Sequence, residues 1–281
     1  MNALSFDGNK NISFKGVNLY VDYVNSRLKI LDYTCISENI LGEITDYTAN
    51  EKLGKILSIC RIGVLKPFRE SGFVVEGTIP GYFKGEDAYC VSYYLDTNRQ
   101  ISKQEQVENN ILHDCVSSPG SFISGIDENI FIRDANIKDI PQMITLFKEV
   151  FKTYPSPIFS ASYLENILNT KTLFKVVDIE GKIISIASAE MDTLNLNAEI
   201  TDCATYPGYR GKGLLTNLMY QLERTLKEKG FYTLYSLCRA IEPGINKALS
   251  KLQYRYTGRL INNCNICGGF EDMNIWIKRL K

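Results

Sequence analysis

This chain of 281 residues has little histidine or tryptophan and no excess of charge of either sign. It contains one histidine and one tryptophan, and its 32 Lys and Arg residues equal its 32 Asp and Glu residues. A balanced charge creates no positive field that would attract nucleic acid or an anionic membrane. A single histidine cannot build a histidine-based zinc centre. We therefore expect no nucleic-acid partner, no membrane partner and no bound metal.

Long uninterrupted apolar runs are also missing. Residues 1–16 are mostly polar and contain no apolar segment of the kind that a signal peptide needs. The eight cysteines are spread over a chain long enough to form a core without disulfides, so we expect buried, reduced thiols and a cytoplasmic protein. Cys264 and Cys267 have the spacing of a zinc or redox pair, but two further zinc ligands are not at hand. Packing or pocket lining is the favoured interpretation of this pair.

The stretch from Thr201 to Gly230 predicts a strand, a tight basic turn and a long amphipathic helix. Pro207 ends the strand, and an Arg-Gly-Lys-Gly turn, which begins at Arg210, precedes the helix. A helix start exposes unpaired N–H groups, and glycines let an anion approach the backbone closely. The turn therefore predicts a site for a phosphate-bearing ligand, although an ordinary glycine turn with two solvated basic side chains is the alternative.

This turn resembles the pyrophosphate-binding motif of the GCN5-related N-acetyltransferases, or GNAT family. The family pattern is Arg or Gln, two residues, Gly, one residue, then Gly or Ala; the last position here is Leu215. The resemblance implies acetyl-CoA as co-substrate, with its pyrophosphate on the amides of residues 211–215. The cofactor contacts it implies are Cys203, Ala204, Thr205, Arg210, Gly211, Lys212, Gly213, Leu214, Leu215 and Asn246.

The order of predicted elements after residue 129 matches the same family. We expect strands near 130–133, 173–179, 183–191, 198–205, 233–238, 254–260 and 273–278, with helices near 137–151, 161–169, 214–229 and 243–252. The fold class is therefore α/β (α+β), an open mixed sheet flanked by helices. A smaller unit precedes it, with a hairpin at 17–24 and 28–33, a short apolar strand at 55–61 and a helix at 97–110.

The smaller unit echoes the larger one. Residues 57–61 (Leu-Ser-Ile-Cys-Arg) echo residues 235–239 (Tyr-Ser-Leu-Cys-Arg), and Gly77 and Glu86 answer Gly258 and Glu271 further along. We infer a partial, degenerate copy at 1–128 and a catalytic domain at 129–281, with chance similarity as the alternative. Because the first copy has no Arg-Gly-Lys-Gly turn, we expect it to bind no CoA.

A narrower resemblance covers the full chain. The segments 201–205, 210–214, 258–263 and 268–273, together with Ile-Pro-Gly-Tyr-Phe at 79–83, look like the β-lysine N6-acetyltransferases. This family transfers acetyl to the ε-amine of β-lysine, gives a neutral osmolyte and works downstream of a lysine 2,3-aminomutase. The resemblance implies the same small diamine substrate, reaction and compatible-solute role here. The alternatives are another small diamine, a protein amine, or an acyl-CoA-binding regulatory module without turnover.

An ammonium group with a pKa of about 10.4 must lose a proton before it attacks a thioester. Glu199 is the first candidate base, because its strand resembles the one that carries the catalytic glutamate of histone acetyltransferases; a structural hydrogen-bond acceptor is the alternative. Asp202 is second, and strand alternation puts it on the opposite face. The expected helix tyrosine that would protonate the thiolate has no counterpart. The substrate-binding candidates are Arg239, Arg259, Asn262, Asn263, Glu271 and Asp272.

Overall fold

The computed structural model describes residues 8–122 and 130–280. The first half contains β1 (Lys10–Phe14), β2 (Val17–Asp22), β3 (Arg27–Tyr33), α1 (Glu38–Asn50), β4 (Lys55–Arg61), α2 (Leu65–Glu70), β5 (Val74–Phe83), β6 (Glu86–Tyr94) and α3 (Glu105–Ser117). The second half contains β7 (Phe131–Asp134), α4 (Ile140–Val150), α5 (Ala161–Thr170), β8 (Thr172–Ile179), β9 (Lys182–Asp192), β10 (Asn197–Thr205), α6 (Leu214–Glu228), β11 (Thr233–Arg239), α7 (Pro243–Lys251), β12 (Arg255–Ile266) and β13 (Gly269–Arg279).

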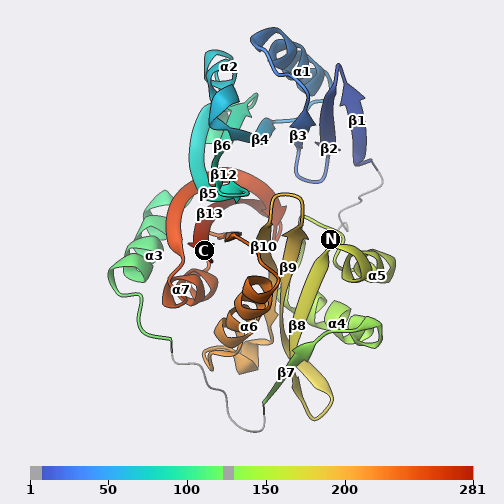
Figure 1. Ribbon diagram of the computed structural model, residues 1–281, viewed down its shortest axis with the longest axis vertical. Coiled ribbons are helices and arrows are strands. Elements are labelled where there is room, and N and C mark those ends of the chain that lie inside the picture. The colour runs from blue at the N-terminus through green and yellow to red at the C-terminus, as the bar shows by residue number, and fades with distance from the viewer. Residues whose placement is uncertain (1–7, 123–129, 281) are drawn as a thin grey trace.

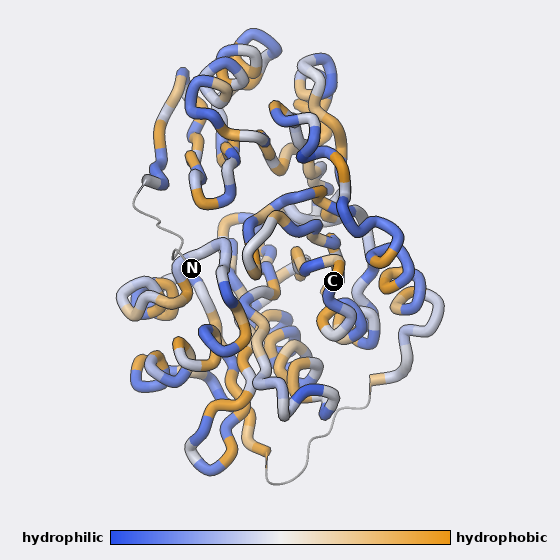
Figure 2. The backbone as a smooth tube through the Cα atoms, turned by 180° about the vertical axis from the view of Figure 1, so that it is seen from behind, coloured by the Kyte–Doolittle hydropathy of each residue, from blue (hydrophilic) through white to orange (hydrophobic). Residues whose placement is uncertain are grey.

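The strands of residues 8–122 and 130–280 form one mixed sheet of 13 strands in the order β1-β2-β3-β4-β6-β5-β12-β13-β11-β10-β9-β8-β7. Helices α1 and α2 pack on the first half of the sheet, and α6 and α7 pack on the second half (Figure 1). Helices α4 and α5 cover the other face of β8 to β10. Hydrophilic and hydrophobic residues alternate along the helices, in α1 and α6 for example (Figure 2), because each helix buries only one face. Within the described ranges, no helix combines the length and apolar character needed to cross a membrane.

The mixed sheet flanked by helices confirms the predicted fold class. Strand β1 was not predicted, and the helix expected at 97–110 is wrong: a short 3-10 turn lies at Thr97–Gln100, and α3 begins only at Glu105. Helix α3 has a weak apolar stripe and lies against α7, so a tertiary contact rather than local periodicity fixes it. The proposed domain boundary at residue 128 falls outside the described residues.

The two halves repeat one order of strands. In each half a parallel pair, β3 with β4 or β10 with β11, lies beside the second strand of a hairpin, β6 or β13. The Ser58 hydroxyl donates to the Ile30 carbonyl at 3.1 Å, and the Ser236 hydroxyl donates to the Ile200 carbonyl at 2.8 Å. These two serines lie in the two echoing segments of the sequence. The same side chain therefore makes the same cross-strand bond in each half.

Strands β5 and β12 join the halves, with Gly77 opposite Gly258. Each glycine follows a bulge in its own hairpin, so the halves meet at equivalent points and are related by an approximate two-fold axis. A Cβ on Gly77 would lie 2.9 Å from the Gly258 Cα and 3.0 Å from the Thr257 carbonyl oxygen. Side-chain carbons essentially never come this close to a backbone, so only glycine permits the crossing.

Candidate functional site

Strands β10 and β11 diverge after a short paired segment. Their parallel pairing covers only three positions, from Asn197 opposite Thr233 to Glu199 opposite Tyr235. Beyond this point β10 continues to Thr205 and β11 to Arg239 without pairing to each other in the described structure. Beyond the Ile200 carbonyl, which accepts from the Ser236 hydroxyl, the edge of β10 that faces β11 has no strand partner over residues 201–205, so a ligand can pair with it there.

A cavity of about 770 Å³ lies at this divergence. Its walls come from the end of β10, the turn before α6, the end of β11, the start of α7 and the β12–β13 turn. The wall is positively charged at Arg210, Lys247 and Lys251, and negatively charged at Asp202 and Glu242. A cavity of this size suits an extended ligand with an anionic end.

The turn before α6 provides the positive end of the cavity. Gly211 and Gly213 have φ angles of +79° and +74°, and no atom lies within 4 Å of a Cβ built on Gly211. Helix α6 begins at Leu214 without a side-chain cap, so the first N–H groups keep their hydrogen-bonding capacity. The apolar face that predicted this helix is buried at Leu218, among others. An anion can therefore approach both the helix start and the glycine backbone.

Asp202 lies in the cavity wall at a β-bulge. The register of β10 with β9 shifts between Thr201 and Ala204, and Asp202 has a φ of +46°. The Ser188 hydroxyl donates to the Asp202 carboxylate at 2.8 Å, and Ser188 lies opposite Thr201 on the face of Glu199. The prediction that Asp202 and Glu199 point to opposite faces is therefore wrong, because the bulge interrupts the alternation. Burial raises the pKa of Asp202 to about 6, against hydrogen bonds from Ser188 and Tyr154.

Glu199 lies on the same face, opposite Glu190 of β9 and beside Tyr235 of β11. Burial raises the pKa of Glu199 to about 8, and the negative charge of Glu190 adds to the shift. The positive charge of Lys29, in the first half, opposes it. Glu199 is not among the described residues that line the 770 Å³ cavity, whereas Asp202 is.

Comparison with known proteins identifies the arrangement. The acetyltransferase (GNAT) family model matches residues 140–249, which run from α4 to the end of α7 and include the diverging strands. The chain is also 36% identical over 271 residues to the β-lysine N(6)-acetyltransferase of Methanosarcina mazei, covering 89% of this chain and 100% of that protein. The chain belongs to the GNAT family of acetyltransferases. It is an acyltransferase that transfers acetyl to an amine, as the sequence predicted.

Two further relatives of this acetyltransferase extend the match. It is 30% identical to the β-lysine N(6)-acetyltransferase of Methanococcus maripaludis, covering 92% of this chain and 95% of that protein. It is 33% identical to N-acetyltransferase YodP of Bacillus subtilis, covering 96% and 99% of the two chains. An N-acetyltransferase structure from Staphylococcus aureus Mu50 is 20% identical, with a TM-score of 0.49, and covers 55% of this chain and 100% of that one. The predicted resemblance to β-lysine N6-acetyltransferases is confirmed.

The structure brings together most of the predicted cofactor contacts of the acetyltransferase. The cavity wall includes Cys203, Thr205, Arg210, Gly211, Gly213, Leu214 and Leu215. Ala204 and Lys212 are not part of this wall. Asn246 of α7 is fully buried, and its amide donates to the carbonyls of Arg239 and Glu242 and accepts from Asn274 and Trp276. Its hydrogen bonds therefore hold α7 to the sheet.

The predicted substrate contacts separate into two groups. Arg239 lines the cavity and pairs with Glu242 and with Glu271, the latter at 3.1 Å. Arg259 lies away from the cavity wall, bonded to Asn274 at 2.8 Å and to Glu108 at 3.3 Å. The others, also outside the wall, join β12 to neighbouring elements: Asn262 donates to the carbonyls of Arg99 and Ile101, Asp272 accepts from the Asn262 N–H, and Asn263 offers its carbonyl to Arg27.

Several lining residues were missed. Phe151 and Tyr154, after α4, and Lys247 and Lys251 on α7 all face the cavity. The lysines are four residues apart and share one helix face, a spacing that the sequence does contain. The loop of Tyr154 comes from far away in sequence, so no local signal marked it. Cys267 also lines the cavity while Cys264 packs in the core, and no described group of three or more His, Cys, Asp or Glu side chains could hold a metal ion.

Proposed function

We propose that this acetyltransferase transfers the acetyl group of acetyl-CoA directly to the N6 amine of β-lysine and forms N6-acetyl-β-lysine. The observation that carries the proposal is the 36% identity to the β-lysine N(6)-acetyltransferase of Methanosarcina mazei. That match covers all of the relative, so it includes both halves of the present chain. The catalytic half alone would support only a general amine acetyltransferase.

The described residues fit acetyl-CoA. The uncapped start of α6 and the open space beside Gly211 suit the pyrophosphate, with Arg210 adding positive charge. Lys247 and Lys251 supply further cations at the same cavity for the remaining phosphate. The unpaired edge of β10 over residues 203–205 suits the amides of the pantetheine arm. Bound acetyl-CoA supplies an activated thioester, and these residues hold its carbonyl at the divergence of the strands.

The proton of the attacking ammonium passes to a carboxylate of β10, for which Glu199 and Asp202 are the candidates. A base works best when its pKa lies near the working pH. Asp202, with a pKa of about 6, is ionised at neutral pH and lies in the cavity wall. Glu199, with a pKa of about 8, is mostly protonated until an ammonium group comes near and favours its charged form.

The reaction removes one positive charge from the acceptor. β-Lysine carries two ammonium groups and one carboxylate, and the amide product keeps one ammonium and one carboxylate. A product without net charge suits accumulation as a compatible solute in osmoadaptation, and a lysine 2,3-aminomutase would supply the substrate. In this proposal residues 129–281 form the catalytic domain and residues 1–128 a degenerate copy that binds no CoA.

The test is thiol release from acetyl-CoA with purified protein and β-lysine, α-lysine, spermidine or no acceptor, with the product mass recorded. We expect turnover selective for β-lysine and one added acetyl group. Turnover on spermidine or on a protein amine alone would show that β-lysine is not the substrate. CoA binding without any turnover would favour an acyl-CoA-binding module over an enzyme.

The two candidate bases are separated by pH profiles of kcat/KM for the Asp202→Asn and Glu199→Gln variants. The catalytic base is the residue whose substitution lowers kcat/KM by about 100-fold or more and removes the acidic limb of the pH profile. A Glu199→Gln variant that keeps full activity at every pH removes Glu199 from this role.

A further inference from the structure

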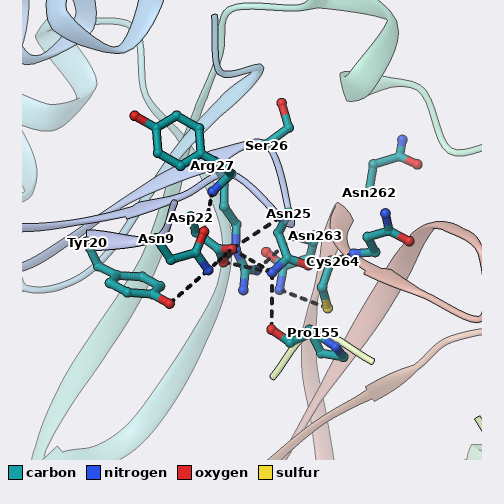
Figure 3. Close-up of polar contacts among 12 residues, drawn as sticks. Asn9, Tyr20, Asp22, Asn25, Ser26, Arg27, Pro155, Asn262, Asn263 and Cys264 are labelled. Carbon is teal, nitrogen blue, oxygen red and sulfur yellow. Dashed lines mark hydrogen bonds and ion pairs between the residues drawn. The ribbon is translucent and has the colours of Figure 1, made fainter. Parts of the chain in front are cut away.

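Reciprocal hydrogen bonds connect the two halves. The Arg27 side chain at the start of β3 donates to the Asn263 carbonyl of β12 at 2.8 Å (Figure 3). At the equivalent place in the second half, the Asn197 amide at the start of β10 donates to the Tyr82 carbonyl of β5 at 2.9 Å. Each hairpin therefore reaches across the approximate two-fold axis and holds the start of a strand in the other half.

Equivalent hydrogen bonds also come from the next strand of each half. Lys55 of β4 donates to the Ile261 carbonyl at 2.9 Å, and Thr233 of β11 donates to the Pro80 carbonyl at 3.0 Å. Asn25, in the β2–β3 turn, also donates to the Pro155 carbonyl at 3.3 Å (Figure 3). The face of β3 that carries Arg27 is therefore fixed against the second half.

Lys29 and Glu199 are equivalent residues in this arrangement. Lys29 lies opposite Leu57 in the β3–β4 pair, Glu199 lies opposite Tyr235 in the β10–β11 pair, and Leu57 and Tyr235 begin the two echoing segments. Each follows the anchored start of its strand by two residues. Their strand neighbours pack under α1, α2, α6 and α7, so both side chains lie on the opposite face of the continuous sheet.

The charges of the two residues act on each other. The pKa of Lys29 is lowered to about 8, first by the positive charge of Arg27 and then by burial, and the negative charges of Asp22 and Glu199 oppose the shift. The Lys29 ammonium lies 6.0 Å from the centre of the Tyr20 ring, and no described carboxylate comes within 4.0 Å of it. Lys29 is thus a partly buried cation for which the described residues provide no salt-bridge partner.

We propose that Lys29, contributed by the first half, binds the carboxylate of an amino-acid acceptor, while Glu199 on the same face of the sheet meets an ammonium group of that acceptor. This inference rests on the proposed function and adds which side chains bind the carboxylate and an ammonium group of the acceptor. Neither Arg239 nor Arg259 is as well suited, because each already pairs with a glutamate.

This placement gives the first half a role in binding the acceptor. Asp202 follows Glu199 on the same face and lies in the wall of the 770 Å³ cavity, where the thioester would be held. An acceptor that extends from Asp202 past Glu199 toward Lys29 places its ammonium groups near the two carboxylates. Its own carboxylate, at the far end, then lies near the Lys29 cation. A diamine without a carboxylate leaves Lys29 unpaired and faces repulsion from it.

The experiment compares kcat/KM for β-lysine with that for 1,4-diaminopentane, which is β-lysine without its carboxylate. Charged hydrogen bonds contribute about 1.5–3 kcal/mol, so Lys29→Met should lower the β-lysine to diaminopentane ratio roughly 10- to 100-fold. Lys29→Arg should keep most of the ratio, because it retains the cation. Lys66→Met, an exposed lysine of the same half, is the matched control and should leave the ratio unchanged. A ratio is insensitive to general loss of folded protein.

The outcomes distinguish this inference from the proposed function. If the wild type prefers β-lysine and Lys29→Met leaves the ratio unchanged, the Lys29 site is overturned and the function stands. If the wild type prefers another amino acid and Lys29→Met abolishes that preference, the Lys29 site stands and β-lysine does not. Preference of the wild type for diaminopentane overturns both.

Discussion

A methyl group added at the crossing of β5 and β12 should separate the two halves of the sheet. In Gly258→Ala the new Cβ would lie closer than 3.0 Å to the Glu76 carbonyl oxygen and the Gly77 Cα. Both are backbone atoms, so no side-chain rotation relieves the contact, and the two strands must move apart. The Lys29 and Glu199 side chains, which share one face of the sheet because of this crossing, then move apart as well.

The expected cost is about 3 kcal/mol, the upper end for overpacking a well-packed site. For a chain of this size it corresponds to a fall in melting temperature of about 6–12 °C. Differential scanning calorimetry measures the shift. The matched control is Gly42→Ala in the middle of α1, where no atom lies within 4 Å of the added Cβ. Alanine is the better helix former, so this control should stabilise by about 1 kcal/mol.

The reasoning is refuted if Gly258→Ala melts at or above the wild-type temperature. Gly77→Ala gives an independent check, because its Cβ meets the same crossing from the other strand at 2.9 Å from the Gly258 Cα. A strongly destabilised Gly258 variant beside an unaffected Gly77 variant would place the strain elsewhere in β12.

Two further predictions concern the cavity and its carboxylate. Glu199 binds a proton more tightly in the folded chain, with a pKa of about 8, than in the unfolded chain, so the stability it contributes is present below pH 4.5 and is lost as pH rises through 8. In urea unfolding at pH 8.5, the free energy of unfolding of Glu199→Gln should therefore exceed that of the wild type by up to about 4 kcal/mol. At pH 4.5 the two free energies should be similar. A difference that does not change with pH would contradict this prediction. Gly213→Glu places a side chain and a negative charge at the start of α6 and should weaken CoA binding at least about 10-fold by calorimetric titration, whereas Gly181→Glu, in the β8–β9 turn with a similar φ, should not. Equal affinity of these two variants would exclude the α6 start as the phosphate site.

Local patterns predicted much of the second half. The apolar spacing after Gly213 predicted α6, and Arg210, Gly211 and Gly213 of the turn line the cavity. Strand β4 has the predicted bounds, Lys55–Arg61, because a short apolar run rich in β-branched residues specifies a buried strand without help from distant segments. The echo between residues 57–61 and 235–239 marks two strands with the same neighbours.

Other features depended on contacts that no local pattern contains. The bulge at Asp202 turns that side chain to the face of Glu199, and only the pairing of β10 with β9 sets its position. Arg259 and Asn246 are polar residues in the expected region, yet their partners on α3, β11 and β13 hold them in structural roles.

The sequence by itself determined the family, through its resemblance to known acetyltransferases, and the helix that follows the glycine turn, because an apolar stripe is a local pattern. Only the tertiary structure decided that Lys29 shares one face of the sheet with Glu199, 170 positions later in the chain, and that their charges act on each other. Its physical cause is the close crossing of Gly77 and Gly258, which lets the two halves share one curled sheet.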